Sequence, residues 1–111
     1  MRQEISEFLG YVGTERGYSP KTVAAYGYDL GKFSQFLAAE PGSSEDIDQY
    51  AIKAFMTHLA NNGYRNANSA VARGRKLAVL KSFFKYLLSL GKVKTDPTAN
   101  IKMPKTKQKE P

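Results

Sequence analysis

The sequence contains no cysteine and a single histidine, His58. Without thiols the chain forms no disulfides and no thiolate metal sites, which is compatible with a reducing cytoplasm, where we expect the protein to act. No run of 18 or more apolar residues is present, so we expect no membrane span, and Met1-Arg2 leads into an amphipathic pattern instead of a signal peptide. A glycine-rich phosphate loop is also missing. We therefore expect no cofactor, no metal ion and no small-molecule ligand.

Acidic residues are scarce in the second half of the chain. The net charge is +7, but residues 1–63 hold five Lys/Arg against eight Asp/Glu, whereas residues 64–111 hold twelve against two. A basic half beside a mildly acidic half indicates an oriented surface, and nucleic acid is the commonest partner of such a surface. An anionic membrane or an acidic protein would also satisfy this charge.

Four stretches carry the three/four spacing of apolar residues that is typical of amphipathic helices. It predicts helices over residues 3–16, 20–39, about 48–61 and about 68–91, and no stretch alternates with the period of a strand. The apolar stripes are Ile5, Phe8, Leu9 and Val12; Val23, Tyr26, Leu30, Phe33 and Leu37; Ile52, Phe55, Met56 and Leu59; and Leu77, Leu80, Phe84 and Leu87. The predicted fold class is all-α, a compact four-helix bundle.

Residues suited to helix ends flank these stretches. Ser19 and Asp48 fit the N-cap position, where a side-chain oxygen accepts from an otherwise unpaired amide. Gly17 stands where a left-handed residue would end the first helix. Inside the second helix, Gly27 and Gly31 each cost about 1 kcal/mol relative to alanine. Either they allow another backbone to approach closely, or they are tolerated defects.

The sides opposite the apolar stripes of the second and fourth helices carry no acidic residue. On the second helix this side holds Lys21, Ala24, Tyr28, Lys32 and Gln35, and on the fourth it holds Arg75, Ala78, Ser82 and Lys85. A helix of this kind buries one side in the core and lays the other against a polyanion. The same pattern is typical of an ordinary solvated surface helix. We interpret Phe83, Phe84 and Tyr86 as core and rim, and not as platforms for base stacking.

Two blocks of the sequence resemble the N-terminal SAM-like, or core-binding, domain of tyrosine recombinases of the phage integrase and Xer type. The first block, GYSPKTVAAYGYDLGKFSQFL, is similar to the second helix of that family through Ser19, Pro20, Thr22, Tyr26, Asp29, Leu30 and Phe33. The second block, LAVLKSFFKYLLSLGKVKTDPTANIKMPK, is similar to the last helix and the linker through Leu77, Leu80, Lys81, Ser82, Phe83, Phe84, Pro97, Pro104 and Lys105. Asp96 replaces the usual asparagine before Pro97. The resemblance spans about residues 4–105.

The resemblance implies that the chain is half of a clamp around recombination-site DNA. Residues 1–95 would form the SAM-like domain, and residues 96–111, rich in lysine and proline, an extended linker toward a catalytic domain. Its second and fourth helices would face double-stranded DNA, and other recombinase protomers would be further partners. We predict DNA contacts from Lys21, Thr22, Tyr28, Lys32, Arg73, Arg75, Lys76, Lys81, Ser82 and Lys85. Binding by this domain alone should be weak, because the second helix has Gly27, Tyr28 and Gly31 where relatives carry arginines.

The residues that perform catalysis in that family have no counterpart here. His58 is followed by Leu59, Ala60 and Asn61, so the His-x-x-Arg motif is absent, and no tyrosine stands in a recognisable nucleophile motif. We expect the chain not to be an enzyme by itself, and to be an excised domain of a longer recombinase or a natural truncation. The alternative function is a helical protein-interaction module in which the basic half is fortuitous.

Overall fold

The computed structural model describes residues 2–39, 47–61 and 70–102, and within them the chain forms four helices and no strand. They are α1 (Arg2–Thr14), α2 (Pro20–Ala39), α3 (Gln49–Asn61) and α4 (Ala70–Ser89). The predicted all-α class is confirmed, and the predicted boundaries agree to within about two residues. The expected start of α4 near Asn68 lies outside the described residues.

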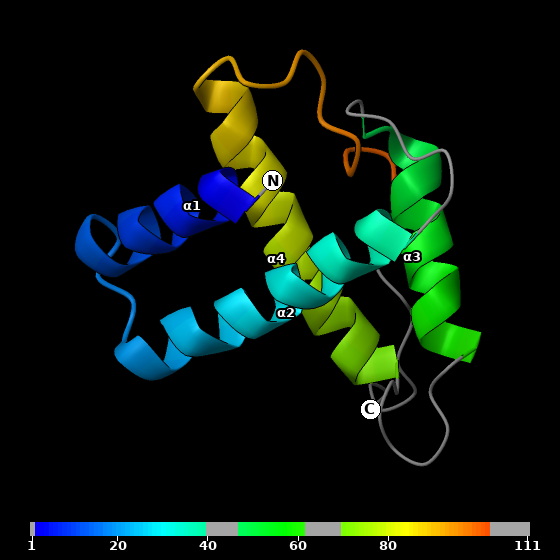
Figure 1. The fold of residues 1–111 in the computed structure, drawn as a ribbon, viewed down its shortest axis with the longest axis horizontal. Helices are drawn as coiled ribbons and strands as arrows, with labels where there is room; N and C mark the ends of the chain where they lie inside the picture. The colour runs from blue at the N-terminus through cyan, green and yellow to red at the C-terminus, as the bar shows by residue number, and fades with distance from the viewer. Residues whose placement is uncertain (1, 40–46, 62–69, 103–111) are drawn as a thin grey trace, which may run out of the picture.

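Helix α4 lies at the centre of the bundle and packs against each of the other three helices. In Figure 1, α1 and α2 form an antiparallel pair, α4 runs obliquely across both, and α3 stands on the other side of α4. All four predicted apolar stripes face the core: the residues shielded from solvent include Phe8, Phe33, Ile52, Leu77 and Phe84. The bundle therefore closes through the faces that the helical spacing predicted.

A chain of aromatic contacts runs through the core and joins all four helices. Phe8 of α1 meets Phe83 of α4 edge-on, with ring centroids 5.4 Å apart, and Phe83 meets its neighbour Phe84 at 5.2 Å. Phe33 of α2 packs edge-to-face on both Phe84 and Phe55 of α3, at 6.2 and 5.1 Å. Edge-to-face pairs add about 0.5–1.5 kcal/mol to the area that they bury. Because α4 supplies the middle two rings, it is buried on more sides than one apolar stripe accounts for.

The predicted caps are present. The Ser19 hydroxyl oxygen accepts a hydrogen bond from the Thr22 amide at 3.2 Å, and the Asp48 carboxylate accepts one from the Ala51 amide at 3.0 Å. Gly17 and Gly91 have φ values of 72° and 74° after α1 and α4. At both positions the next amide donates back to the last turn of the helix, which satisfies a carbonyl that the helix leaves unpaired.

The chain after α4 folds back onto the bundle. The Asp96 carboxylate accepts hydrogen bonds from both the amide and the hydroxyl of Thr98, at 2.8 and 2.6 Å. Lys81 on α4 donates to the Thr98 carbonyl oxygen at 2.7 Å, and Pro97, Thr98 and Ile101 are buried. Residues 96–101 are thus held against the domain, although we expected an extended linker from residue 96. The rest of that predicted linker lies outside the described residues.

The two interior glycines of α2 differ in their surroundings. A Cβ at Gly27 would stand 3.2 Å from Cδ1 of Leu9 on α1, whereas a Cβ at Gly31 would meet nothing within 4 Å. Gly27 therefore serves the close packing of α1 on α2, against a side chain and not a backbone. Gly31 has no packing role among the described residues, so on stability grounds it is a tolerated defect of the helix.

Gly31→Ala should raise the free energy of unfolding by about 1 kcal/mol, because alanine loses less backbone entropy in a helix than glycine. Urea unfolding followed by circular dichroism measures this change. Gly17→Ala is the matched control and should lower stability by about 1 kcal/mol, because its φ of 72° strains a residue that has a Cβ. A loss of stability in Gly31→Ala would contradict the open space described at this position.

Candidate nucleic-acid interface

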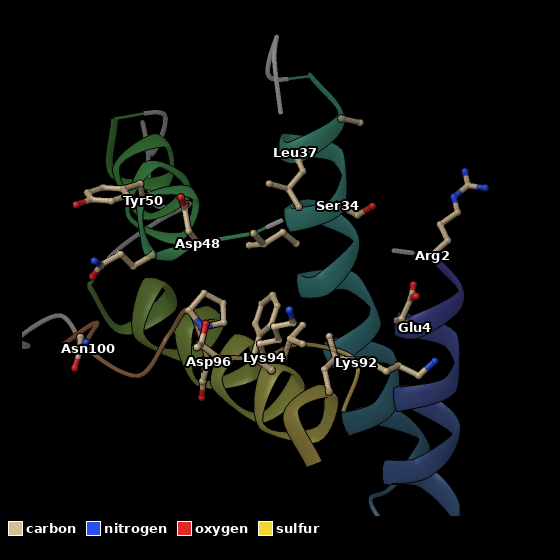
Figure 2. A pocket seen from close by; sticks show the side chains of 18 residues that line it. Arg2, Glu4, Ser34, Leu37, Asp48, Tyr50, Lys92, Lys94, Asp96 and Asn100 are labelled. Atoms are coloured by element: carbon tan, nitrogen blue, oxygen red, sulfur yellow. The ribbon is translucent and has the colours of Figure 1, made fainter. Parts of the chain in front are cut away.

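A large hollow among the described residues does not suit a polyanion. A cavity of about 1240 Å³ lies between the end of α2, the start of α3 and residues 92–100. Figure 2 shows charged side chains of both signs around it: Asp48 and Asp96 on one side, and Glu4 and Lys92 on the other. Lys92 extends toward α1, where its Nζ lies 4.0 Å from the Glu7 carboxylate. The outer face of α2, and not this cavity, offers a surface of a single sign.

The outer face of α2 is exposed as predicted. Lys21, Tyr28 and Lys32 lie on solvent, together with Ala24 and Gln35. Tyr28 is 60% exposed, and Nζ of Lys32 lies 5.3 Å from the centre of its ring. This cation–π contact holds the ammonium group and the phenol together on the surface. The face thus presents two cations and a hydroxyl with no carboxylate among them.

The outer face of α4 is narrower. Arg75 and Lys85 are exposed, Ala78 is exposed between them, and Ser82 is half-buried. Neither basic residue is turned inward among the leucines. This face is narrow because Val79 and Phe83, which do not belong to the predicted apolar stripe of α4, are also buried.

A buried carboxylate connects these two faces. Asp29 of α2 has only 2% of its side chain exposed, and it accepts two hydrogen bonds of 3.3 Å from Nε and Nη2 of Arg75 on α4. Nζ of Lys76 lies 3.4 Å from the same carboxylate. Lys32 stands three residues after Asp29, so it lies close to the ion pair on its own helix. The Arg75 end of the α4 face therefore adjoins the α2 face where α2 crosses α4.

Lys76, which we predicted as a DNA contact, belongs to this buried ion pair. Its side chain is only 8% exposed and its ammonium group is bound to Asp29. A buried ammonium group needs a counterion, and Asp29 supplies it. Lys76 therefore has a structural role in this fold and is not on an exposed basic face.

Three other residues that we predicted as DNA contacts are hydrogen-bonded within the domain or half-buried. Lys81 is half-buried and its ammonium group donates to the Thr98 carbonyl oxygen, so it anchors the segment after α4. The Thr22 hydroxyl oxygen accepts a hydrogen bond of 3.0 Å from the Ser19 hydroxyl, as part of the α2 cap. Arg73, in the first turns of α4, is half-buried. Of the ten predicted residues, those that the structure leaves on exposed faces are Lys21, Tyr28, Lys32, Arg75 and Lys85.

The model of the N-terminal SAM-like domain of phage integrases matches residues 5–91. The chain belongs to this family.

The chain is similar to tyrosine recombinases named XerC. It is 37% identical to that of Pelobacter propionicus over 114 residues, which cover 100% of this chain and 36% of the relative. It is 40% identical to that of Lactobacillus delbrueckii subsp. bulgaricus over 105 residues, which cover 95% of this chain and 35% of the relative. The chain thus spans about a third of the length of these curated relatives. No solved structure matches it.

A cation that the sequence analysis missed lies beside the α4 face of this SAM-like domain. Arg16, between α1 and α2, lines a groove together with Lys85 of α4. A hydrogen bond with Tyr11 raises the pKa of the Arg16 guanidinium, and its carbon Cζ lies 5.5 Å from the centre of the Tyr18 ring. The groove also holds Tyr86, whose pKa is raised by burial and by the carboxylates of Glu7 and Glu15. The sequence signal was an arginine at the end of the first predicted helix, directly before Gly17.

The described residues offer little for other chemistries. No three of their histidine, aspartate and glutamate side chains converge as a metal ion would require. Within the same residues, no helix has the length and apolar character needed to cross a membrane. His58 is exposed, with its ring centroid 5.0 Å from that of Phe36.

Asp29→Asn should lower the free energy of unfolding by about 3 kcal/mol, because it leaves the buried Lys76 ammonium group without a counterion. Urea unfolding of the single variant and of Asp29→Asn/Lys76→Met measures this effect, and the double variant should recover most of the loss. Arg75→Ala should cost less than about 1 kcal/mol, because 57% of its side chain is exposed. Equal losses for Asp29→Asn and Arg75→Ala would contradict the assignment of Lys76 as the dependent partner.

Lys81→Met should loosen residues 96–101 while leaving the helices folded. A hydrogen bond from a charged donor contributes about 1.5–3 kcal/mol, so local opening should increase amide exchange at Thr98 and Ile101 by about tenfold or more. Native-state hydrogen exchange resolves this change, with the Leu77 amide in α4 as an internal reference. Lys92→Met is the matched control, since the Lys92–Glu7 pair is exposed on both sides. Unchanged exchange at both amides would show that Lys81 does not hold the segment.

Proposed function

We propose that this chain is the core-binding domain of a site-specific tyrosine recombinase and that it grips duplex DNA with the outer faces of α2 and α4. The observation that carries the proposal is the junction of two exposed basic faces at the Asp29–Arg75 pair, in a chain that belongs to the phage-integrase SAM-like family. Exposed cations on separate sides of the bundle would not suit one duplex. Two adjoining faces suit a single groove and its flanking phosphates.

The exposed cations supply the sequence-independent part of the affinity. Lys21 and Lys32 on α2, and Arg75 and Lys85 on α4, would each neutralise a phosphate and release a counterion. Four such contacts give weak binding that falls steeply with salt. Tyr28, with its hydroxyl on the surface, is placed to meet a phosphate or a base edge, and only a contact of the second kind adds sequence preference.

We assign the cleavage and rejoining of DNA to parts of the parent recombinase that this chain does not include. The chain matches about a third of the length of its XerC relatives, and His58 does not stand in a His-x-x-Arg motif. In this proposal, further recombinase protomers assemble on the same DNA. The SAM-like domain itself binds the duplex and orients the recombinase on it.

Charge reversal at Lys32 or Lys85 should lower the affinity for a short mixed-sequence duplex by about tenfold, because each variant replaces a phosphate contact with a repulsion. Fluorescence anisotropy over a series of salt concentrations measures both the affinity and its salt dependence. The slope of log affinity against log salt should become shallower by about one for each contact that is lost.

Lys53→Glu on α3 is the matched control, because Lys53 is exposed and its reversal changes the net charge by the same amount. It should change the affinity by less than about twofold, through the net charge alone. If Lys32→Glu, Lys85→Glu and Lys53→Glu weakened binding equally, the DNA-binding face would be misassigned. If the domain bound no duplex even at low salt, the alternative of a protein-interaction module would be favoured.

A further inference from the structure

Two cations converge on one carboxylate at the crossing of α2 and α4, and their surroundings differ. Lys76 has 8% of its side chain exposed, and Arg75 has 57% exposed. Asp29, which binds both, has 2% exposed. The three charges leave one positive charge in excess at this point. This excess lies between the exposed faces of the two helices.

The guanidinium of Arg75 has donors to spare. It carries five N–H groups, and its described hydrogen bonds to Asp29 use Nε and one N–H of Nη2. Because more than half of the side chain is exposed, the other N–H groups are accessible from the surface. An arginine fixed along one edge by a carboxylate can still form a charge-assisted hydrogen bond to a phosphate with the rest of its donors.

We propose that Asp29 is a positioning residue, which holds the Arg75 guanidinium at the α2–α4 crossing in the orientation that receives a DNA phosphate. Lys76 makes this arrangement possible, because it remains as the buried counterion of Asp29 when Arg75 shares its charge with the phosphate. The proposal rests on the proposed function, since it concerns the same DNA-binding face. It adds a negatively charged residue, which carries no affinity of its own, to the residues on which DNA binding depends.

The proposal makes a prediction opposite in sign to that of simple electrostatics. A carboxylate near DNA repels phosphates, so its removal alone would strengthen binding. If Asp29 positions Arg75, its removal weakens binding instead, because a freely rotating arginine must lose more conformational entropy when it meets the phosphate. The two effects separate when the net charge is held constant.

The test uses D29N/K76M, which removes one negative and one positive charge and so keeps the net charge of the domain. Affinity for the same short duplex is measured by anisotropy for the wild type, R75A, D29N/K76M and the triple variant, after thermal unfolding has shown that each is folded. We expect R75A to lower affinity about tenfold in the wild type and about twofold or less in the D29N/K76M background. D29N/K76M by itself should lower affinity about fivefold. The same loss from R75A in both backgrounds would overturn the proposal, and so would unchanged or increased affinity in D29N/K76M.

A second pair of variants keeps Asp29 and Lys76 in place, and it decides the outcome if D29N/K76M does not fold. R75K retains the charge but loses the planar fork that binds two carboxylate oxygens, so it should lower affinity about fivefold. K53R also exchanges one cation for another, but at an exposed position on α3 outside the proposed DNA-binding faces, and it should change affinity by less than about twofold. Equal effects of R75K and K53R would overturn the positioning role. If Lys32→Glu and Lys85→Glu also left binding intact, the proposed function itself would fail.

Discussion

The burial of one carboxylate constrains the relative placement of α2 and α4. Burying the Asp29 carboxylate costs several kcal/mol of desolvation free energy. This cost is offset only if cations come within hydrogen-bonding distance of the carboxylate oxygens. Both cations come from consecutive residues of α4, so their side chains leave the helix in directions about 100° apart. One can then enter the interior while the other remains at the surface. A shift of α4 by one residue relative to α2 would leave Asp29 without this pair, and the outer faces of the two helices would no longer meet.

The aromatic core imposes the complementary constraint. Phe83 and Phe84 point to different sides of α4 and engage rings from α1 and α2, and through Phe33 the contacts reach α3. Because α4 is packed on so many sides, only a narrow face of it is exposed to solvent. The exposure of its lysines therefore depends on their position: Lys85 lies on the exposed face, Lys81 at the edge of this face, and Lys76 in the interior of the bundle. Fewer cations are available to a partner than the net positive charge of the sequence suggests, because Lys76 and Lys81 bind acceptors within the domain.

The local features of this chain could be predicted from the sequence, and the tertiary ones could not. The Ser19 and Asp48 caps, the glycine ends of α1 and α4 and the apolar stripes follow from the spacing of residues within one helix. The roles of Lys76 and Lys81 depend on Asp29 and Thr98, which are distant in sequence, and no helical pattern indicates such pairs. The Asp-Leu pair of α2 was part of the family resemblance, but an aspartate between the exposed Tyr28 and Lys32 gave no sign that it is buried. For the same reason Gly27 and Gly31, equivalent in the sequence, differ only once α1 is in place.

The attachment of the chain after α4 to the bundle affects how strongly a domain with few exposed cations could bind DNA as part of a recombinase. Four exposed cations supply little affinity at physiological salt, so in the proposed function the domain must gain from linkage to other DNA contacts. The gain from linkage depends on effective concentration, which falls when a tether is long or free to point anywhere. Here the Lys81–Thr98 hydrogen bond and the buried Ile101 fix the chain to the bundle as far as Ile101, whereas a free linker would begin at residue 96. A DNA contact made by a part of the recombinase beyond Ile101 would therefore be tethered from a defined point on the bundle. Lys81, which the sequence predicted as a DNA contact, would then contribute to binding by shortening the tether.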